Sequence, residues 1–343
     1  MQHSKLHSII LILCVILFFS CSDKVTVTEY GVFAPSRLHY VKGQDGVTPI
    51  DFDGKHTMWT FGDTITHEGM IANSLAFTDK VDACNVRQLQ FHYYTENEEI
   101  VPFIRNDKHE DPSRDRLWAF DGIRINNTVY VYYAHVYIHD PLKPLSFSLM
   151  ESSVAHWDVP YNWSLGKPVH FKRLKNLFTG DVPALGASVL HYNDYVYVVG
   201  HISKNGKSSL VIARVKPQHI LQRDTYSFLQ GDSSWKNTVT AAIQLYGDVA
   251  GECSLGYDEN YKLFYIVYCQ LFSGNIVMSI APSIEQLPFA KKIIVYTPAK
   301  LKGTSMMYYS AKEILRQKNQ RYIIYINPAE YQPYLMQVNM NLH

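Results

Sequence analysis

Two aspartates near the start of the chain have the type and spacing needed for acid and base chemistry. Asp45 precedes one short apolar run and Asp63 ends the next, with a turn at Asp53-Gly54 between them. An antiparallel hairpin with this turn would return Asp63 to the level of Asp45. Paired carboxyl groups cleave glycosidic bonds, because one protonates the leaving oxygen while the other acts as nucleophile or base. We therefore predict that both are catalytic, although each could instead serve only its turn by accepting backbone N–H bonds.

Further polar and aromatic residues are expected to surround this pair as a substrate-binding site. Hydroxyl, carboxyl and imidazole groups can bond sugar hydroxyls, and aromatic rings can stack on sugar rings. The histidines could instead have only a structural role, with their ring nitrogens hydrogen-bonded within the second strands. Glu252 could instead form an ion pair with Lys312. The expected substrate-binding residues are Asp121, His135, Ser188, His201, Glu252, Gln270, Lys312, Trp118 and Tyr309.

A repeated hairpin explains how residues so far apart could meet. Five times a small or acidic cluster opens a strand, which is followed by a turn and a run rich in Tyr, Val, Ile and Phe. These second runs are residues 57–63, 129–135, 195–201, 262–270 and 322–327. A third strand-like run follows each hairpin and a fourth follows in most copies. Each repeat therefore predicts one four-stranded antiparallel sheet.

The repeats predict an all-β fold, a single five-bladed β-propeller of four-stranded antiparallel blades. The first strand of each propeller blade lines a central channel, so polar residues on these strands gather at one mouth. The last repeat ends at its third strand, Tyr334 to Val338, which would leave an unpaired edge. We expect Val25 to Thr28 to supply the missing strand and close the ring. The alternative of two small β domains needs a linker, and the one candidate, residues 141–144, lies inside a repeat.

Composition limits what the chain could bind. Its 343 residues include 32 Lys+Arg and 31 Asp+Glu, with a formal net charge of +1. This balance argues against a nucleic-acid partner, which would need a basic surface. The 25 Tyr, 16 Phe and 5 Trp favour sheets and suit contacts with sugars. We expect a monomer whose partner is a polysaccharide or oligosaccharide.

The N-terminus is interpreted as a lipoprotein signal peptide, residues 1–20, that precedes a propeller domain over residues 21–343. Ile9 to Phe19 is an unbroken apolar run, which is shorter than the roughly 20 residues that span a membrane. Its end at Ser20-Cys21 resembles a bacterial lipobox, in which the cysteine is acylated. An ordinary signal peptide with a chance cysteine is the alternative. An acylated Cys21 would anchor the protein in the bacterial cell envelope, at the outer membrane or on the periplasmic side.

Three cysteines remain after the signal and the lipid attachment site, at positions 84, 253 and 269. They lack the spacing of metal ligands, so we predict no metal and no cofactor. Cys253 and Cys269 are expected on neighbouring strands. They could form a disulfide in an oxidising compartment, or they could be two separate buried thiols.

Four short strings resemble those of a known family. They are Gln44-Asp45-Gly46, Trp59-Thr60-Phe61-Gly62-Asp63-Thr64, Gly251-Glu252-Cys253-Ser254 and Tyr309-Ser310-Ala311-Lys312. The sequence is similar to secreted five-bladed propellers, long catalogued as a domain of unknown function, that include endo-D-arabinanases. The family's paired acidic residues fall on Asp45 and Asp63. This chain differs from many members at Gln44 and Cys253.

The resemblance implies a lipid-anchored glycoside hydrolase that acts on a furanose-rich polysaccharide, similar to an endo-D-arabinanase. A rival interpretation is a glycan-binding surface lipoprotein without catalysis, which would use the same residues to capture sugars. The two differ in one structural feature. An enzyme needs its two aspartates to face each other across an open pocket with one pKa raised, because a proton must remain available near neutral pH.

Overall fold

The protein is an all-β chain in the computed structural model, which describes residues 25–143, 146–179, 183–204, 207–239, 242–301 and 306–341. The predicted signal segment and Cys21 lie outside these residues. Within them, no helix has both the length and the apolar character needed to cross a lipid bilayer. The only helical segments that they contain are short 3-10 turns, η1 (Pro35–His39), η2 (Pro217–His219), η3 (Arg223–Thr225) and η4 (Ile284–Phe289).

Consecutive hairpins build the first three large sheets. The first contains β3 (Thr48–Asp51), β4 (His56–Phe61), β7 (Ser74–Asp79) and β8 (His92–Tyr93). The second contains β11 (Asp115–Ile125), β12 (Thr128–Ile138), β13 (Phe147–Asp158) and β14 (Lys172–Phe178). The third contains β15 (Ala184–Tyr192), β16 (Tyr195–Lys204), β17 (Lys207–Val215), β18 (Ser227–Leu229) and β19 (Trp235–Lys236). This third sheet has one strand more than the sequence predicts.

Two more large sheets and two small ones complete the strands. The fourth large sheet contains β20 (Val249–Asp258), β21 (Leu263–Gln270), β22 (Ile276–Ala281) and β23 (Lys292–Tyr296). The fifth contains β24 (Tyr309–Gln317), β25 (Gln320–Asn327), β26 (Gln332–Met340) and β1 (Val25–Val32). The small sheets contain β2 (Gly43–Gln44), β5 (Thr64–Ile65) and β6 (Met70–Ile71), and β9 (Thr95–Glu96) with β10 (Glu99–Ile100).

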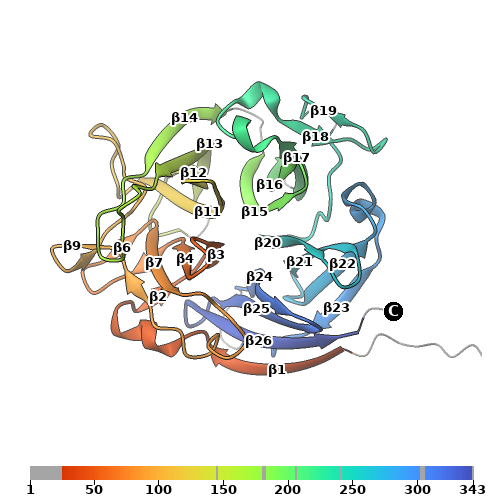
Figure 1. Cartoon of the computed structure of the whole chain (residues 1–343), viewed down its shortest axis with the longest axis horizontal. Coiled ribbons are helices and arrows are strands. Elements are labelled where there is room, and N and C mark those ends of the chain that lie inside the picture. Colours follow the sequence, from red (N-terminus) through yellow and green to blue (C-terminus); the bar gives the residue numbers. More distant parts are fainter. Residues whose placement is uncertain are drawn as a thin grey trace, which may run out of the picture.

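The five large sheets form a closed ring around a central axis (Figure 1). Their first strands lie innermost, and each contacts the next in the order β3, β11, β15, β20, β24 and again β3. Five buried apolar clusters fill the spaces between neighbouring sheets. Met58 and Trp157, for example, belong to one cluster between the first and second sheets. The fold is therefore a β-propeller, as the sequence predicts.

The ring closes by pairing the N-terminal strand with the C-terminal one. β1 lies antiparallel to β26, with Val25 opposite Met340 and Val27 opposite Val338. Both valines also pack against the cluster between the fourth and fifth sheets. The expected closure by Val25 to Thr28 is confirmed.

Removing residues 24–29 should lower the melting temperature by about 5 °C or more, because it exposes the edge of β26 and uncovers part of a core. Thr26→Ser with Thr28→Ser is the matched control, since both side chains are exposed and the ladder remains. Differential scanning calorimetry measures the effect. A truncated chain with the same melting temperature as the control would contradict this prediction.

The three remaining cysteines are free. Cys253 and Cys269 are buried and Cys84 is exposed, and none forms a disulfide. Cys253 and Cys269 are therefore two separate buried thiols and not a disulfide. Burial raises the pKa of Cys253 to about 12, so this thiol stays protonated near neutral pH.

Candidate active site

Asp45 and Asp63 lie directly opposite each other in the backbone. Asp45 lies between β2 and β3, and Asp63 lies between β4 and β5. The Asp45 amide donates to the Asp63 carbonyl at 3.2 Å, and the Gly62 amide donates to the Asp45 carbonyl at 2.9 Å. These two bonds fix both carboxyl groups at the same end of the first sheet.

Two glycines allow this close approach. Gly46 has a φ of +58°, and a Cβ there would lie 2.8 Å from the Gly62 nitrogen. A Cβ on Gly62 would lie 2.6 Å from Oδ1 of Asp45. A larger residue at either position would push the two chain segments apart. The two glycines of Asp45-Gly46 and Gly62-Asp63 therefore let these two segments pack directly against each other.

Asp45 accepts two phenol hydrogen bonds on one carboxyl oxygen. The hydroxyls of Tyr309 and Tyr331 each donate to its Oδ2 at 2.9 Å. Burial, followed by the charges of Asp63 and Glu252, raises its pKa well above the usual range. The phenol bonds favour the ionised form but are outweighed. Asp45 therefore holds a proton more readily than an ordinary aspartate does.

Asp63 has cationic and indole partners instead. Its Oδ1 accepts from Nε1 of Trp118 at 3.1 Å and from Nη1 of Arg116 at 3.4 Å. Burial raises its pKa to about 6, and Arg116 and Trp118 oppose that rise. Asp63 is thus largely ionised at pH 7. The pKa values of both carboxyl groups are raised, and their different partners suit them to different roles in acid and base chemistry.

Glu252 and His201 complete the cluster. Ser310 donates a hydrogen bond through its hydroxyl to Oε2 of Glu252. Oε1 of the same carboxylate faces Gly46, where a Cβ would lie 3.6 Å away. Burial lowers the pKa of His201, although Glu252 and a backbone bond with Gly251 oppose this. His201 is therefore a neutral imidazole that can bond a hydroxyl group but carries little charge.

A bulge in the inner strands separates the other expected residues from this cluster. Pairing slips in β11 between Ala119 and Gly122, in β15 between Leu185 and Ser188, and in β24 between Tyr309 and Lys312. Tyr309 lies before its bulge, whereas Ser188 and Lys312 lie after theirs. The structure therefore offsets Ser188 and Lys312 from Tyr309 along the channel.

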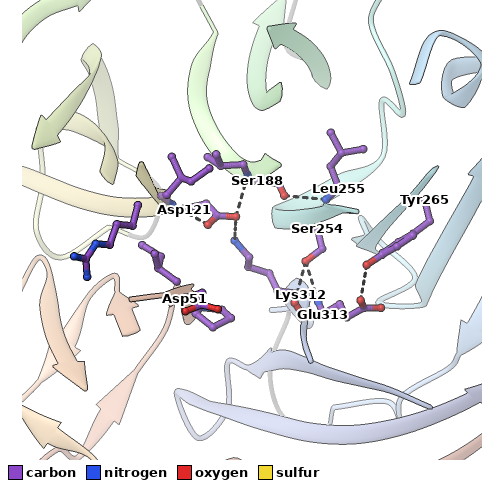
Figure 2. A pocket seen from close by; sticks show the side chains of 14 residues that line it. Asp51, Asp121, Ser188, Ser254, Leu255, Tyr265, Lys312 and Glu313 are labelled. Atoms are coloured by element: carbon purple, nitrogen blue, oxygen red, sulfur yellow. Dashed lines mark hydrogen bonds and ion pairs between the residues drawn. The ribbon is translucent and has the colours of Figure 1, made fainter. Parts of the chain in front are cut away.

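Asp121, Ser188 and Lys312 line a cavity of about 290 Å³ further along the channel. Figure 2 shows Lys312 reaching from β24 toward Asp121 on β11. Its Nζ lies 3.2 Å from Oδ2 of Asp121, and that oxygen also accepts from the Val189 amide. The Oγ of Ser188 accepts a hydrogen bond from the Leu255 amide at 2.8 Å. Among the described residues, no hydrogen bond or ion pair joins Asp121, Ser188 or Lys312 to Asp45 or Asp63.

Two further expected residues bond elsewhere. His135 bonds Oδ1 of Asp115 through Nε2 at 2.9 Å. Gln270 donates to Oδ2 of Asp248 at 2.7 Å. Neither contacts the aspartate pair, so a structural role at the strand ends accounts for both.

Three residues of the site, Arg116, Ser310 and Tyr331, are not among those expected from the sequence. Arg116 lies two positions before Trp118 and has no motif of its own. Tyr331 lies in the turn between β25 and β26 with a φ of +54°, a strained value for an aromatic residue. A backbone bond from Gln44 to the Tyr331 carbonyl, at 2.8 Å, holds this turn against Asp45. Such a contact between the two ends of the chain has no local sequence signal.

The cluster is suited to proton transfer and hydrogen bonding. Within the ranges that the structure covers, no group of three or more His, Cys, Asp or Glu has the arrangement of a metal site. The polar groups that converge are Asp45, Asp63, Glu252, His201, Arg116, Trp118, Tyr309, Tyr331 and Ser310. They provide three carboxyl groups and several hydrogen-bond donors within one small region.

The fold and this cluster define a class: β-propellers with carboxyl groups gathered at one end of the inner strands. Within that class, the chain belongs to the family described as domain of unknown function DUF4185, whose profile matches residues 38–340. No curated protein matches the chain.

Several solved structures have a similar fold. A candidate hydrolase from Bacteroides ovatus ATCC 8483 is 13% identical with a TM-score of 0.68, covering 92% of this chain and 90% of that one. A GH43_1 enzyme from Xanthomonas citri, complexed with xylose, is 12% identical with a TM-score of 0.54, covering 91% and 90%. A family 117 glycoside hydrolase from Zobellia galactanivorans is 10% identical with a TM-score of 0.51, covering 93% and 90%. At such identities the likeness concerns the fold.

Proposed function

We propose that the protein is a glycoside hydrolase that acts on a furanose-rich polysaccharide, as an endo-D-arabinanase does. The observation that carries this proposal is the opposed pair of Asp45 and Asp63, two buried carboxyl groups whose pKa values are both raised. A site that merely bound sugar would gain nothing from keeping two desolvated carboxyl groups together. Two propellers of similar fold are described as glycoside hydrolases, which is consistent with the proposal.

The hydrogen bonds support different roles for the two members of the pair. Both phenols bond Oδ2 of Asp45, which leaves Oδ1 to carry a proton for the leaving oxygen. Trp118 and Arg116 occupy Oδ1 of Asp63, so its Oδ2 is left to act as nucleophile or to activate water. Asp45 is therefore the acid and Asp63 the nucleophile or base.

The rate should fall on the acid side with an apparent pKa of about 6, because Asp63 becomes protonated there. Arg116→Lys weakens the interaction that favours the ionised form, so it should shift this limb to higher pH. The kcat/KM profile between pH 4 and 9 measures both limbs. An acid limb that stays at the same pH in Arg116→Lys would contradict the assignment of Asp63.

A polysaccharide panel tests the function itself. We expect the purified protein to release reducing ends from D-arabinan, linear L-arabinan or a fructan, and none from cellulose. Release from none of the furanose polymers would overturn the enzyme proposal. Binding without release would favour the glycan-binding alternative.

We also propose that Cys21 is acylated and that the mature protein is a lipid-anchored monomer in the bacterial cell envelope. The support is the apolar run that ends at Ser20-Cys21. Mass spectrometry of the mature N-terminus should show a chain that begins at a lipid-modified Cys21, and a Cys21→Ser chain should leave the membrane fraction. An unmodified N-terminus at another residue would contradict the anchor.

A further inference from the structure

A large groove runs along the outer side of the first sheet, away from the aspartate pair. We call it the outer groove; it has a volume of about 910 Å³ and is lined mainly by residues 66–71, 92–95, 98–102 and 163–169, with His39 and Tyr40. Its walls are the hairpin of β5 and β6, the hairpin of β9 and β10, and a loop of the second sheet. This volume is that of a ligand site, and nothing described so far occupies it.

Aromatic rings and unpaired polar groups line the outer groove together. Tyr40 is 48% exposed and packs against Tyr93 with ring centroids 5.5 Å apart. Glu68, Glu98 and Glu99 are exposed, and their carboxylates bond no other described residue. Exposed rings beside free carboxylates are suited to sugars, because the rings stack on C–H faces while the carboxylates accept from hydroxyls.

The charged residues that line the outer groove limit which ligands it could bind. The three glutamates oppose a single lysine, Lys167, whose Nζ already donates to the Asn162 carbonyl. An anionic polymer would be repelled, so the ligand is neutral or cationic.

Glu98 occupies a costly position in this wall. It has a φ of +69° and follows Asn97 at +50°, in the two-residue turn between β9 and β10. Glycine suits the second position of such a turn better, because a side chain there is strained. A glutamate at this position is best explained by what its carboxylate binds.

The outer groove is connected to the aspartate pair at two places. The chain continues from Asp63 directly through β5 into the hairpin that forms one wall. The Tyr93 hydroxyl donates at 2.9 Å to Oε1 of Gln44, the residue before Asp45. A chain-like ligand could therefore extend from one site to the other on the same sheet.

We infer that the outer groove binds a segment of a neutral polysaccharide, the same class of chain that the aspartate pair cleaves, and the choice of glycan over a cationic ligand rests on the function proposed above. Tyr40 would stack on a sugar ring, and Glu98 would accept from its hydroxyls. The groove holds the polymer and leaves the chemistry to Asp45 and Asp63.

Three variants of the full chain test this inference. Tyr40→Ala removes the exposed ring, and Glu98→Gly removes the carboxylate while relieving its turn. Tyr161→Ala is the matched control, because Tyr161 is a fully exposed aromatic residue in the same loop as Trp163 but outside the groove lining. Affinity electrophoresis in D-arabinan and linear L-arabinan gives Kd, and turnover of a short arabino-oligosaccharide gives the basal activity.

We expect Tyr40→Ala and Glu98→Gly each to weaken polymer binding by about tenfold. Glu98→Gly should melt no lower than the native protein, and short-substrate turnover should be unchanged in both. Native polymer affinity in both variants would overturn the inference. It would also be overturned if poly-lysine displaced arabinan while Tyr40→Ala left arabinan affinity unchanged. If the native protein cleaves nothing but binds arabinan through Tyr40 and Glu98, the groove is confirmed and the enzyme proposal fails.

Discussion

Replacing Asp45 or Asp63 by Asn should lower turnover of the cleaved polysaccharide by about a hundredfold or more, the usual scale for general acid–base catalysis. Asn keeps the shape of the side chain and its capacity to accept the bonds from Tyr309 or Trp118. It removes the proton from one position and the charge from the other. The loss should therefore appear in kcat, with little change in polymer affinity.

The two variants should differ in their pH profiles. Asp63→Asn removes the group with a pKa of about 6, so its residual activity should lose the acid limb. Asp45→Asn should keep that limb, because Asp63 is still present. Initial rates across the pH range separate the two patterns.

Asp51→Asn is the control for this pair. Asp51 belongs to the same sheet but is exposed; its Oδ2 pairs with Lys80 at 3.1 Å and its Oδ1 accepts from the Gly54 amide at 3.0 Å. It lines the cavity at the other end of the channel, so turnover should remain native. Native turnover in both Asp45→Asn and Asp63→Asn would show that the pair is not catalytic.

The fold could be predicted because its signals are local and repeated. Each repeat has turn residues and a run of β-branched and aromatic residues, so strand order follows from chain order. The closure by β1 followed from a missing strand, since an unpaired edge is unfavourable. The pairing of Asp45 with Asp63 was predictable for the same reason, because one hairpin connects them.

The rest of the site depends on contacts between distant segments. Bulges in the inner strands shift Lys312 and Ser188 away from the level of Tyr309. A bulge adds residues to one strand of a pair only, and no turn residue or apolar run in the aligned repeats marks its position. Tyr331 joins the site through a strained turn, and its partner Asp45 is 286 residues away. No pattern within either segment indicates this contact.

Lys312 is expected to stabilise the fold, because it neutralises a buried carboxylate in the channel. It is 2% exposed and its Nζ lies 3.2 Å from Oδ2 of Asp121. Burial raises the pKa of Asp121, and the charge of Lys312 is the main opposing effect. Lys312→Met keeps most of the side-chain volume but leaves Asp121 buried without a counter-charge. Breaking one partner of such a pair costs about 3–5 kcal/mol of unfolding free energy.

Two further variants test whether the loss of unfolding free energy in Lys312→Met comes from the unpaired charge. Lys80→Met breaks the exposed pair with Asp51, whose side chains are 53% and 62% exposed, and should cost about 1 kcal/mol or less. Lys312→Met with Asp121→Asn removes both buried charges. It should recover part of the stability, because no buried charge is left unpaired and the single Asn oxygen can still accept from either the Val189 or the Gly122 amide, which now bond different oxygens of Asp121.

The pH dependence of Lys312→Met separates an unpaired charge from a packing defect. Without Lys312, the pKa of Asp121 should rise further, because burial then acts with less opposition. A carboxyl whose folded pKa lies above its unfolded value stabilises the fold at low pH and loses that contribution as pH rises through the folded pKa. Urea unfolding should therefore show a larger deficit at pH 8 than at pH 5, relative to the native protein. A deficit that is equal at both pH values, or that persists in the double variant, would mean that lost packing around Lys312 is the cause.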